Sequence, residues 1–371
     1  MRDILVGHER LLWIGERMER LPAALGAREI DLEGSLVIPG IIDGHAHLTG
    51  GGGEAGAETR VPAPWLSQYT TGGVTTAIGV LGTDDVTRTT GDLLVTARGL
   101  VADGLSAWCH TGGYHVPPVT LTGSVRGDIT HVDRIIGVGE IAISDHRSSQ
   151  PTIDEIMRLA ADAHVGGLMT GKAGILHLHV GDGVRGLDLI RRALDTSEIP
   201  GRVFNPTHVN RRRALFEEAV AITSRGCVVD ITAFEVEADE DAWSAPDALE
   251  RYFASGAPAD RVTVSSDGGG CLPVFNDEGR VVRMGVGDSG ALVQCLRELV
   301  TRGHPMERAL APMTSNVAAL LRLPRKGRLL PGYDADLAVL DEKLAIRHVM
   351  ARGAWHVYDG VAVRRGMFEP G

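Results

Sequence analysis

Two histidines spaced two residues apart, His45 and His47, end an apolar, β-branched run that begins at Val37 and passes through a Pro-Gly turn. Because the side chains of a strand alternate between its two faces, both imidazoles should project to the same side. Two imidazoles on one face at a strand end are typical of a zinc site, which needs further nitrogen or oxygen ligands from elsewhere in the chain. The alternative is a buried strand that carries two hydrogen-bonded histidines.

That first run is one of a series of apolar, β-rich segments. Eight of them follow one another, at residues 37–47, 74–81, 105–111, 134–143, 173–180, 202–209, 227–233 and 261–267. Segments of helical length fill most of the intervals, at residues 88–100, 153–164, 187–194, 212–223 and 245–254. Strands that alternate with helices indicate a parallel sheet, and eight such units predict an α/β fold of the (β/α)₈ TIM barrel type.

Acids and histidines recur near the ends of these runs, and barrel active sites lie at the C-terminal ends of the strands. Glu140 falls in the fourth run, whereas the fifth, sixth and eighth runs end near His179, His208 and Asp267. Each has an ordinary explanation by itself: a core histidine for His179, a helix N-cap for Asp267, a surface acid for Glu140. Together with the two histidines of the first run, they predict a metal centre at one end of the barrel.

The two ends of the chain have the pattern of short strands. Residues 4–6 and 11–15 predict a hairpin, and residues 28–32 and 36–38 continue in β style. After a predicted helix at 305–323, residues 327–340, 348–351 and 355–358 return to turns and strands. We therefore expect a small β-sandwich domain, formed by residues 1–38 and 325–371, beside a barrel domain of residues 39–324.

Composition restricts the class of protein. The chain has 37 Lys and Arg against 48 Asp and Glu, a net charge of −11, which argues against nucleic acid as a partner. The four cysteines are scattered without a Cys-x-x-Cys pair, as in a protein with reduced thiols in the cytoplasm. We find no apolar run long enough to span a membrane and no signal-peptide pattern, and so expect no membrane association.

Several motifs resemble a known family. Residues 39–47, the late acid Asp267 and residues 331–337 resemble the amidohydrolase superfamily. More narrowly, residues 50–54, 81–84, 111–117, 143–147 and 206–211 resemble the isoaspartyl (β-aspartyl) dipeptidases. The resemblance implies a cytoplasmic binuclear zinc hydrolase that cleaves small isoaspartyl dipeptides. It also implies a homo-oligomer, an octamer by analogy with the family.

The resemblance further implies two Zn²⁺ ions per chain, bridged by Glu140 and a hydroxide. It assigns His45, His47 and Asp267 to the more buried ion, and His179 and His208 to the second. Asp267 would also take the proton of the bridging water and pass it to the leaving amine. Water and an amide react poorly at neutral pH, and a zinc pair lowers the pKa of bound water toward about 7.

The same resemblance assigns a set of residues to the substrate. Glu54, the Gly52 backbone and Thr83 would hold the α-ammonium, and Arg147 and Arg211 would grip carboxylates. Tyr114 would close over the scissile carbonyl and stabilise the oxyanion. An isoaspartyl dipeptide carries one ammonium and two carboxylates, so one acid and two arginines match its charges. The alternative for both arginines is an ordinary surface ion pair.

Three features depart from the family pattern. The family places a carboxylated lysine where Glu140 stands, so the backbone or the separation of the metals must compensate for a shorter side chain. Cys271 replaces a serine that touches the substrate carboxylate, and a thiol is a weaker donor. The N-terminus is also short for the family, so either the β domain lacks its first strands or the sequence starts late.

Two rival functions remain open. Another amidohydrolase reaction, on a cyclic imide or an N-acyl-amino acid, would use the same metal ligands but would not need Glu54 together with two arginines. A non-catalytic scaffold with the same fold would be expected to lack the metal ligands.

Overall fold

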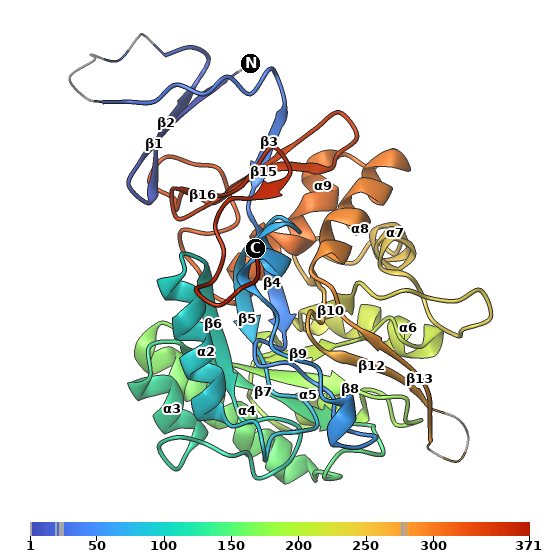
Figure 1. Ribbon diagram of the computed structural model, residues 1–371. Helices are drawn as coiled ribbons and strands as arrows, with labels where there is room; N and C mark the ends of the chain where they lie inside the picture. Colours follow the sequence, from blue (N-terminus) through green and yellow to red (C-terminus); the bar gives the residue numbers. More distant parts are fainter. Residues whose placement is uncertain (1, 19–20, 22–25, 276–277, 279) are drawn as a thin grey trace.

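The computed structural model describes residues 2–18, 21, 26–275, 278 and 280–371. A barrel makes up most of the molecule, and a small β domain built from both chain ends lies against it (Figure 1). No helix in these described ranges is long and apolar enough to cross a lipid bilayer.

Eight parallel strands form the barrel in the order of the sequence. Six of them make one sheet: β4 (Ile41–Ala46), β5 (Val74–Gly79), β6 (Ser106–Thr111), β7 (Ile135–Ile143), β8 (Ile175–Val180) and β9 (Phe204–Thr207). The last two, β10 (Val229–Thr232) and β11 (Val262–Ser265), pair with each other. The Val209 amide donates to the Asp230 carbonyl at 3.3 Å, and the Asp267 amide donates to the His45 carbonyl at 3.2 Å. These bonds connect the pair to both edges of the sheet, which confirms the predicted barrel.

Helices surround the strands (Figure 1). They are α1 (Leu66–Thr70), α2 (Thr90–Ala102), α3 (Val125–His131), α4 (Ile153–Thr170), α5 (Asp188–Thr196), α6 (Arg213–Ile222), α7 (Ala245–Ala254), α8 (Gly290–Thr301), α9 (Met306–Leu310) and α10 (Ser315–Leu320). The five helices predicted between strands are all present. The single helix expected at 305–323 is instead three short pieces, because Pro312 lacks an amide hydrogen and lies in a 3₁₀ turn between α9 and α10.

The small domain contains two antiparallel layers. One is the five-stranded sheet β17-β16-β15-β14-β3, formed by β3 (Leu36–Pro39), β14 (Leu337–Leu340), β15 (Ile346–Ala351), β16 (Ala354–Tyr358) and β17 (Val361–Ala362). The other is the hairpin of β1 (Asp3–Gly7) and β2 (Arg10–Gly15). Leu11 of the hairpin packs in one cluster with Leu337, Val339 and Met350 of the sheet. The pairing of the two chain ends is therefore confirmed, whereas the exact domain boundaries stay a prediction.

One predicted strand is absent from the structure, and one observed hairpin was not predicted. Residues 28–32 form no strand, because Arg28, Glu29 and Asp31 are exposed and no neighbouring strand pairs with them. A hairpin of β12 (Cys271–Phe275) and β13 (Val281–Val286), which we did not predict, projects from the loop after β11.

Apolar packing places the polar site at one end of the barrel. Inside the barrel, Ile42, Ile78, Ile136 and Ile175 form a cluster together with Val317 of α10. Ile42 lies before His45 on β4. The apolar side chains therefore fill the lumen near the N-terminal ends of the strands, and the histidines lie nearer the C-terminal ends. The site can then be polar without opening the core to water.

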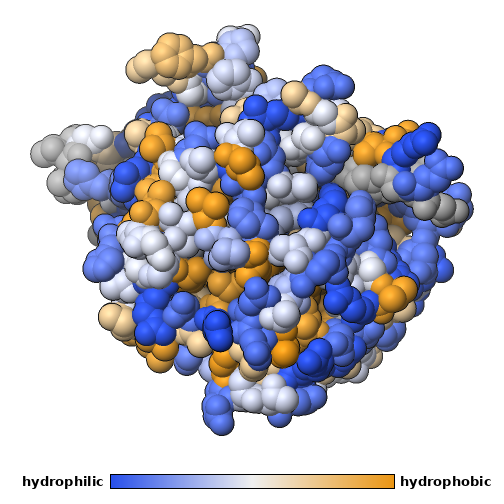
Figure 2. All heavy atoms as spheres, turned by 90° about the horizontal axis from the view of Figure 1, so that it is seen from below, coloured by the Kyte–Doolittle hydropathy of each residue, from blue (hydrophilic) through white to orange (hydrophobic). Residues whose placement is uncertain are grey.

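Apolar side chains are exposed at several places on the described surface, including Val86, Val184 and Met367. Figure 2 shows several apolar patches among hydrophilic residues on the face seen from below. Scattered exposed apolar residues are ordinary for a folded protein. The homo-oligomer therefore stays a prediction.

Candidate metal centre

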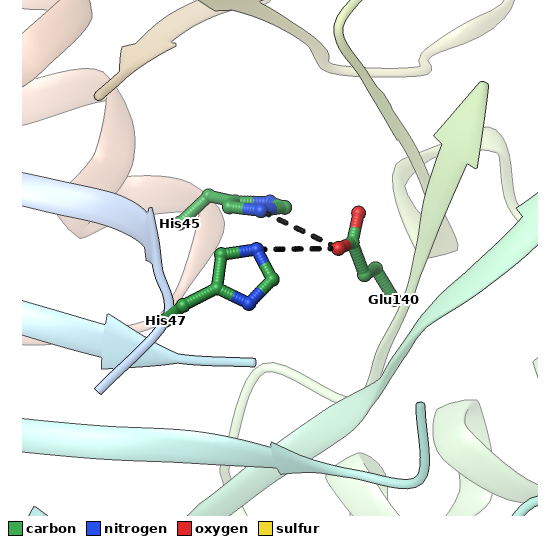
Figure 3. A group of neighbouring side chains, drawn as sticks. All are labelled: His45, His47 and Glu140. Carbon is green, nitrogen blue, oxygen red and sulfur yellow. Dashed lines mark ion pairs between the residues drawn. The ribbon is translucent and has the colours of Figure 1, made fainter. Parts of the chain in front are cut away.

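Glu140 lies at the middle of the buried polar cluster. Its Oε1 is 3.7 Å from Nε2 of His45 and 3.6 Å from Nε2 of His47, as Figure 3 shows. Its Oε2 is 3.1 Å from Nδ1 of His179 and 3.3 Å from Nε2 of His208. Each carboxylate oxygen therefore faces a different pair of imidazoles. This is the arrangement that a carboxylate bridging two cations requires.

Asp267 lies beside the first pair of imidazoles, those of His45 and His47. Its Oδ1 is 3.3 Å from Nε2 of His45 and 3.0 Å from Nε2 of His47. The ligand atoms of His45, His47 and Glu140 lie within 4.8 Å of one another, and so do those of Glu140, His179 and His208. All six predicted ligands thus converge on one buried place.

The donor atoms of this cluster fit divalent cations. In the described part of the chain, Nε2 of His45 and Oδ1 of Asp267 are buried and have no hydrogen-bond partner of good geometry. Buried polar atoms normally find a partner, so such atoms call for a ligand such as an ion. Nitrogen and carboxylate oxygen are the ligands that zinc accepts.

Electrostatics point the same way. Burial opposes ionisation of Glu140, but the imidazoles of His45 and His179 hold the pKa of this carboxyl well below its usual value. Burial likewise opposes protonation of His45, yet Glu140 and Asp267 raise the pKa of this imidazole to about 9. The two carboxylates therefore stabilise a positive charge beside them, which a proton or a metal ion can supply.

A distortion of β7 brings Glu140 into the cluster. The register between β7 and β8 shifts between Val138 and Ile141, so Gly139 and Glu140 bulge out of the regular ladder. Gly139 has φ 145°. A Cβ at this position would lie 2.4 Å from the His177 carbonyl oxygen, so only glycine fits. The bulge that carries Glu140 thus depends on a glycine at position 139.

Two of the cluster residues have left-handed backbones. His208 has φ 61° and Asp267 has φ 55°, values that residues other than glycine rarely adopt. His208 follows directly after β9, and Asp267 lies two residues after the end of β11. Such local strain is characteristic of functional sites and is supported by the surrounding structure.

The imidazoles of the second pair have further partners that sequence analysis missed. Oδ2 of Asp145 is 3.0 Å from Nε2 of His179, and Oγ1 of Thr232 is 2.7 Å from Nδ1 of His208. In each case this partner contacts one ring nitrogen, and the other ring nitrogen faces Glu140. Carboxylate or hydroxyl partners of this kind orient metal-binding histidines. Asp145 lies in the motif 143–147, which was its only signal in the sequence.

The predicted substrate residues gather around His179. The Tyr114 hydroxyl is 2.7 Å from Nδ1 of His179, so it points at the centre. Nη2 of Arg147 and Nη1 of Arg211 each lie 3.4 Å from Nε2 of the same ring. Arg147 is also held by Asp145, through Nε at 3.0 Å and Nη2 at 2.8 Å.

Glu54 lies next to Thr83 and Arg147. The Thr83 hydroxyl donates to its Oε1 at 3.1 Å, and Nη1 of Arg147 lies 3.4 Å from the same oxygen. Its Oε2 is buried without a hydrogen-bond partner among the described residues. Gly52 packs beside Cys271, where an added Cβ would be 3.3 Å from that of the cysteine. Burial, Glu54 and Asp267 raise the pKa of the Cys271 thiol to about 12, so it stays protonated.

The glycine-rich loop that carries Gly52 and Glu54 depends on a residue without any motif. The buried guanidinium of Arg88 donates to the carbonyls of Thr49 at 3.2 Å and Val61 at 2.9 Å. It also donates to the Gly52 carbonyl at 3.4 Å. Arg88 therefore holds the backbone of this loop in place, a role that no local sequence pattern could predict.

Comparison with known proteins gives a consistent result. The amidohydrolase family model matches residues 149–356. A β-aspartyl dipeptidase from the thermophilic, keratin-degrading Fervidobacterium islandicum AW-1, in complex with a β-Asp-Leu dipeptide, is 41% identical, with TM-score 0.90 over 97% of this chain and 94% of that one. A second structure of a β-aspartyl dipeptidase from this organism is 39% identical, with TM-score 0.86 and the same coverage. An imidazolonepropionase of Ruegeria sp. (strain TM1040) is 25% identical, over 91% of this chain and 86% of its own length.

Proposed function

Because the chain belongs to the amidohydrolase family and is a hydrolase, we propose that it cleaves the β-aspartyl amide bond of dipeptides with two bound zinc ions. The observation that carries this proposal is the division of the Glu140 oxygens between two pairs of imidazoles, beneath one acid and two arginines. The two β-aspartyl dipeptidases at 39% and 41% identity support the choice of substrate.

In this proposal, His45, His47 and Asp267 hold one ion, His179 and His208 hold the other, and Glu140 contributes to both. When bound, the zinc ions would supply an acidified water and would polarise the scissile carbonyl. Asp267 accepts the proton of the attacking water and returns it to the leaving amine, as a general base and then a general acid. Burial opposes ionisation of this carboxyl, but contacts with His45 and His47 hold its pKa well below the usual value, so the group is ionised before the reaction and has lone pairs free of protons.

Tyr114 supplies a hydrogen bond to the oxyanion in this scheme. Burial and the neighbouring Glu140 raise the pKa of its hydroxyl well above the ordinary value, so the hydroxyl keeps its proton at neutral pH. A protonated hydroxyl can donate to developing negative charge. Glu54, whose Oε2 lacks a partner among the described residues, receives the ammonium together with Thr83 and Gly52.

A substrate panel with parallel metal analysis tests the proposal. We expect purified protein to contain about two zinc ions per chain and to hydrolyse β-Asp-X dipeptides, but neither the matching α-Asp-X dipeptides nor cyclic imides and imidazolones. Hydrolysis of the cyclic compounds alone would favour the rival that the imidazolonepropionase relative represents. Less than one zinc per chain and no hydrolysis would favour the scaffold. The cytoplasmic location and the homo-oligomer belong to the same proposal.

Replacing Arg211 by alanine should mainly raise KM. A hydrogen-bonded ion pair is worth about 1.5–3 kcal/mol, which corresponds to a rise in KM of about 10- to 100-fold with kcat little changed. Steady-state kinetics on one β-Asp-X dipeptide measure this. Arg213→Ala, which removes an exposed guanidinium at the start of α6, is the matched control. An unchanged KM in Arg211→Ala would show that this side chain does not bind a substrate carboxylate.

A further inference from the structure

A chain of hydrogen-bonding groups in the barrel interior ends on His45. Nδ1 of His45 is 2.8 Å from Nε2 of His177, and Nδ1 of His177 is 2.7 Å from Oδ1 of Asn205. Nδ2 of Asn205 donates to the Val228 carbonyl at 2.8 Å. The relay of His45, His177, Asn205 and Val228 thus connects β4, β8, β9 and the residue before β10, and all its side chains are buried.

The direction of every bond in this relay follows from its outer end. A backbone carbonyl can only accept, so the amide nitrogen of Asn205 must face Val228 and its oxygen must face His177. An amide oxygen can only accept, so Nδ1 of His177 carries the hydrogen. His177 is 1% exposed, and a neutral imidazole at such a site carries a single hydrogen. Its Nε2 is then an acceptor, and Nδ1 of His45 must donate to it.

We propose that His177 and Asn205 are positioning residues that hold His45 with its hydrogen on Nδ1, so that Nε2 presents a lone pair to the zinc ion. This inference rests on the metal centre of the proposed function. It accounts for Nε2 of His45, which faces Glu140 and Asp267 at 3.7 and 3.3 Å. In the other tautomer, Nε2 would carry a hydrogen where the metal has to bind. Orienting partners of this kind typically change metal affinity by about 10- to 100-fold.

Zinc affinity of the intact protein, measured by competition with a chelator, tests the relay. In His177→Leu the acceptor for His45 is lost, and we expect the affinity for the zinc ion that His45 would hold to fall by about 10- to 100-fold. His177→Gln places an amide oxygen close to the position of Nε2, and should recover most of that loss. Leucine and glutamine have similar volumes, so a role in packing alone would affect both variants equally.

Two more variants make the test decisive. His110 stacks on His177 with ring centroids 5.3 Å apart and is equally buried, but lies outside the relay. His110→Leu should therefore keep the zinc affinity of the wild type. Asn205→Leu breaks the relay one step further out and serves if His177→Leu fails to fold; it should also weaken zinc binding. The melting temperature of each metal-free variant reports separately on the fold.

Outcomes for the relay and for the proposed function can be told apart. Equal zinc affinities in the wild type, His177→Leu and Asn205→Leu would overturn the relay while leaving the dipeptidase proposal intact. Equal losses in His177→Leu and His177→Gln would also overturn it. A wild-type protein that binds zinc but cleaves no β-aspartyl dipeptide would refute the substrate and leave the relay standing. A wild-type protein that binds no zinc would refute both.

Discussion

Glu140→Ala should lose bound zinc and hydrolysis together. Its two oxygens face different imidazole pairs, so one substitution removes a ligand from both ions and leaves His45, His47, His179 and His208 without the acid between them. We expect zinc to fall below about one ion per chain, with a loss in kcat/KM of about a thousandfold or more, because both water activation and carbonyl polarisation depend on the ions. Metal analysis and steady-state kinetics on the same preparations measure the two losses.

A graded series makes this prediction specific. Glu140→Gln keeps one oxygen and the side-chain volume, but an amide cannot bridge two cations with equal oxygens, so intermediate zinc content is expected. Glu217→Ala removes an exposed acid from α6 and should behave as the wild type. Two zinc ions and full activity in Glu140→Ala would exclude Glu140 from the centre.

The convergence of the ligands was predictable because of the topology. In a closed parallel barrel all strands end at the same mouth, so His45, His179 and His208 could be assigned to one place without knowledge of any contact. The resemblance to a family then distinguished substrate residues such as Tyr114 and Glu54 from other polar residues in glycine-rich loops. The structure brings both of these to that mouth.

The geometry of the site was not predictable in the same way. The bulge at Gly139 depends on a close approach to the His177 carbonyl, a tertiary contact that leaves only a glycine in the sequence. His177 and Asn205 lie within ordinary apolar runs, and their meeting requires that β8 and β9 are neighbours in the correct register. The left-handed backbone of His208, with φ 61°, likewise has no signal in the sequence. Which side chains contact the candidate metal-binding residues depends on the register between strands. The meeting of the candidate metal-binding residues themselves follows from the position of the strand ends.

The same reasoning explains the errors outside the site. Residues 28–32 alternate between polar and apolar side chains as a strand would, but strand formation also needs a paired neighbour, and no described strand pairs with these residues. Conversely, the hairpin that begins at Cys271 follows a run of three glycines, and its pairing is visible only once β12 and β13 are placed side by side. This hairpin places Cys271 next to Gly52 at the substrate opening.

Asp267→Asn should separate catalysis from the assembly of the site. Asparagine keeps an oxygen at nearly the same place, 3.0–3.3 Å from the nitrogens of His45 and His47, but it cannot accept the proton of the attacking water. General-base catalysis typically contributes about 10²–10⁴ in rate, and we expect kcat to fall by this factor. KM should change little, because the residues proposed to bind the substrate, Glu54, Arg147 and Arg211, are unchanged. Stopped assays at saturating dipeptide, with zinc measured in parallel, provide the comparison.

Asp230→Asn is the matched control, because Asp230 is also a buried carboxyl of the barrel interior. Its oxygens accept from the hydroxyls of Thr207 at 2.7 Å and Thr263 at 2.6 Å, so its role is to hold β9, β10 and β11 together. Loss of that charge should lower the melting temperature without the loss in kcat. If Asp267→Asn kept both its zinc and its rate, proton transfer would have to be assigned to another group. If it lost zinc as completely as Glu140→Ala, Asp267 would act chiefly as a ligand, because a base that only moves protons leaves metal content unchanged.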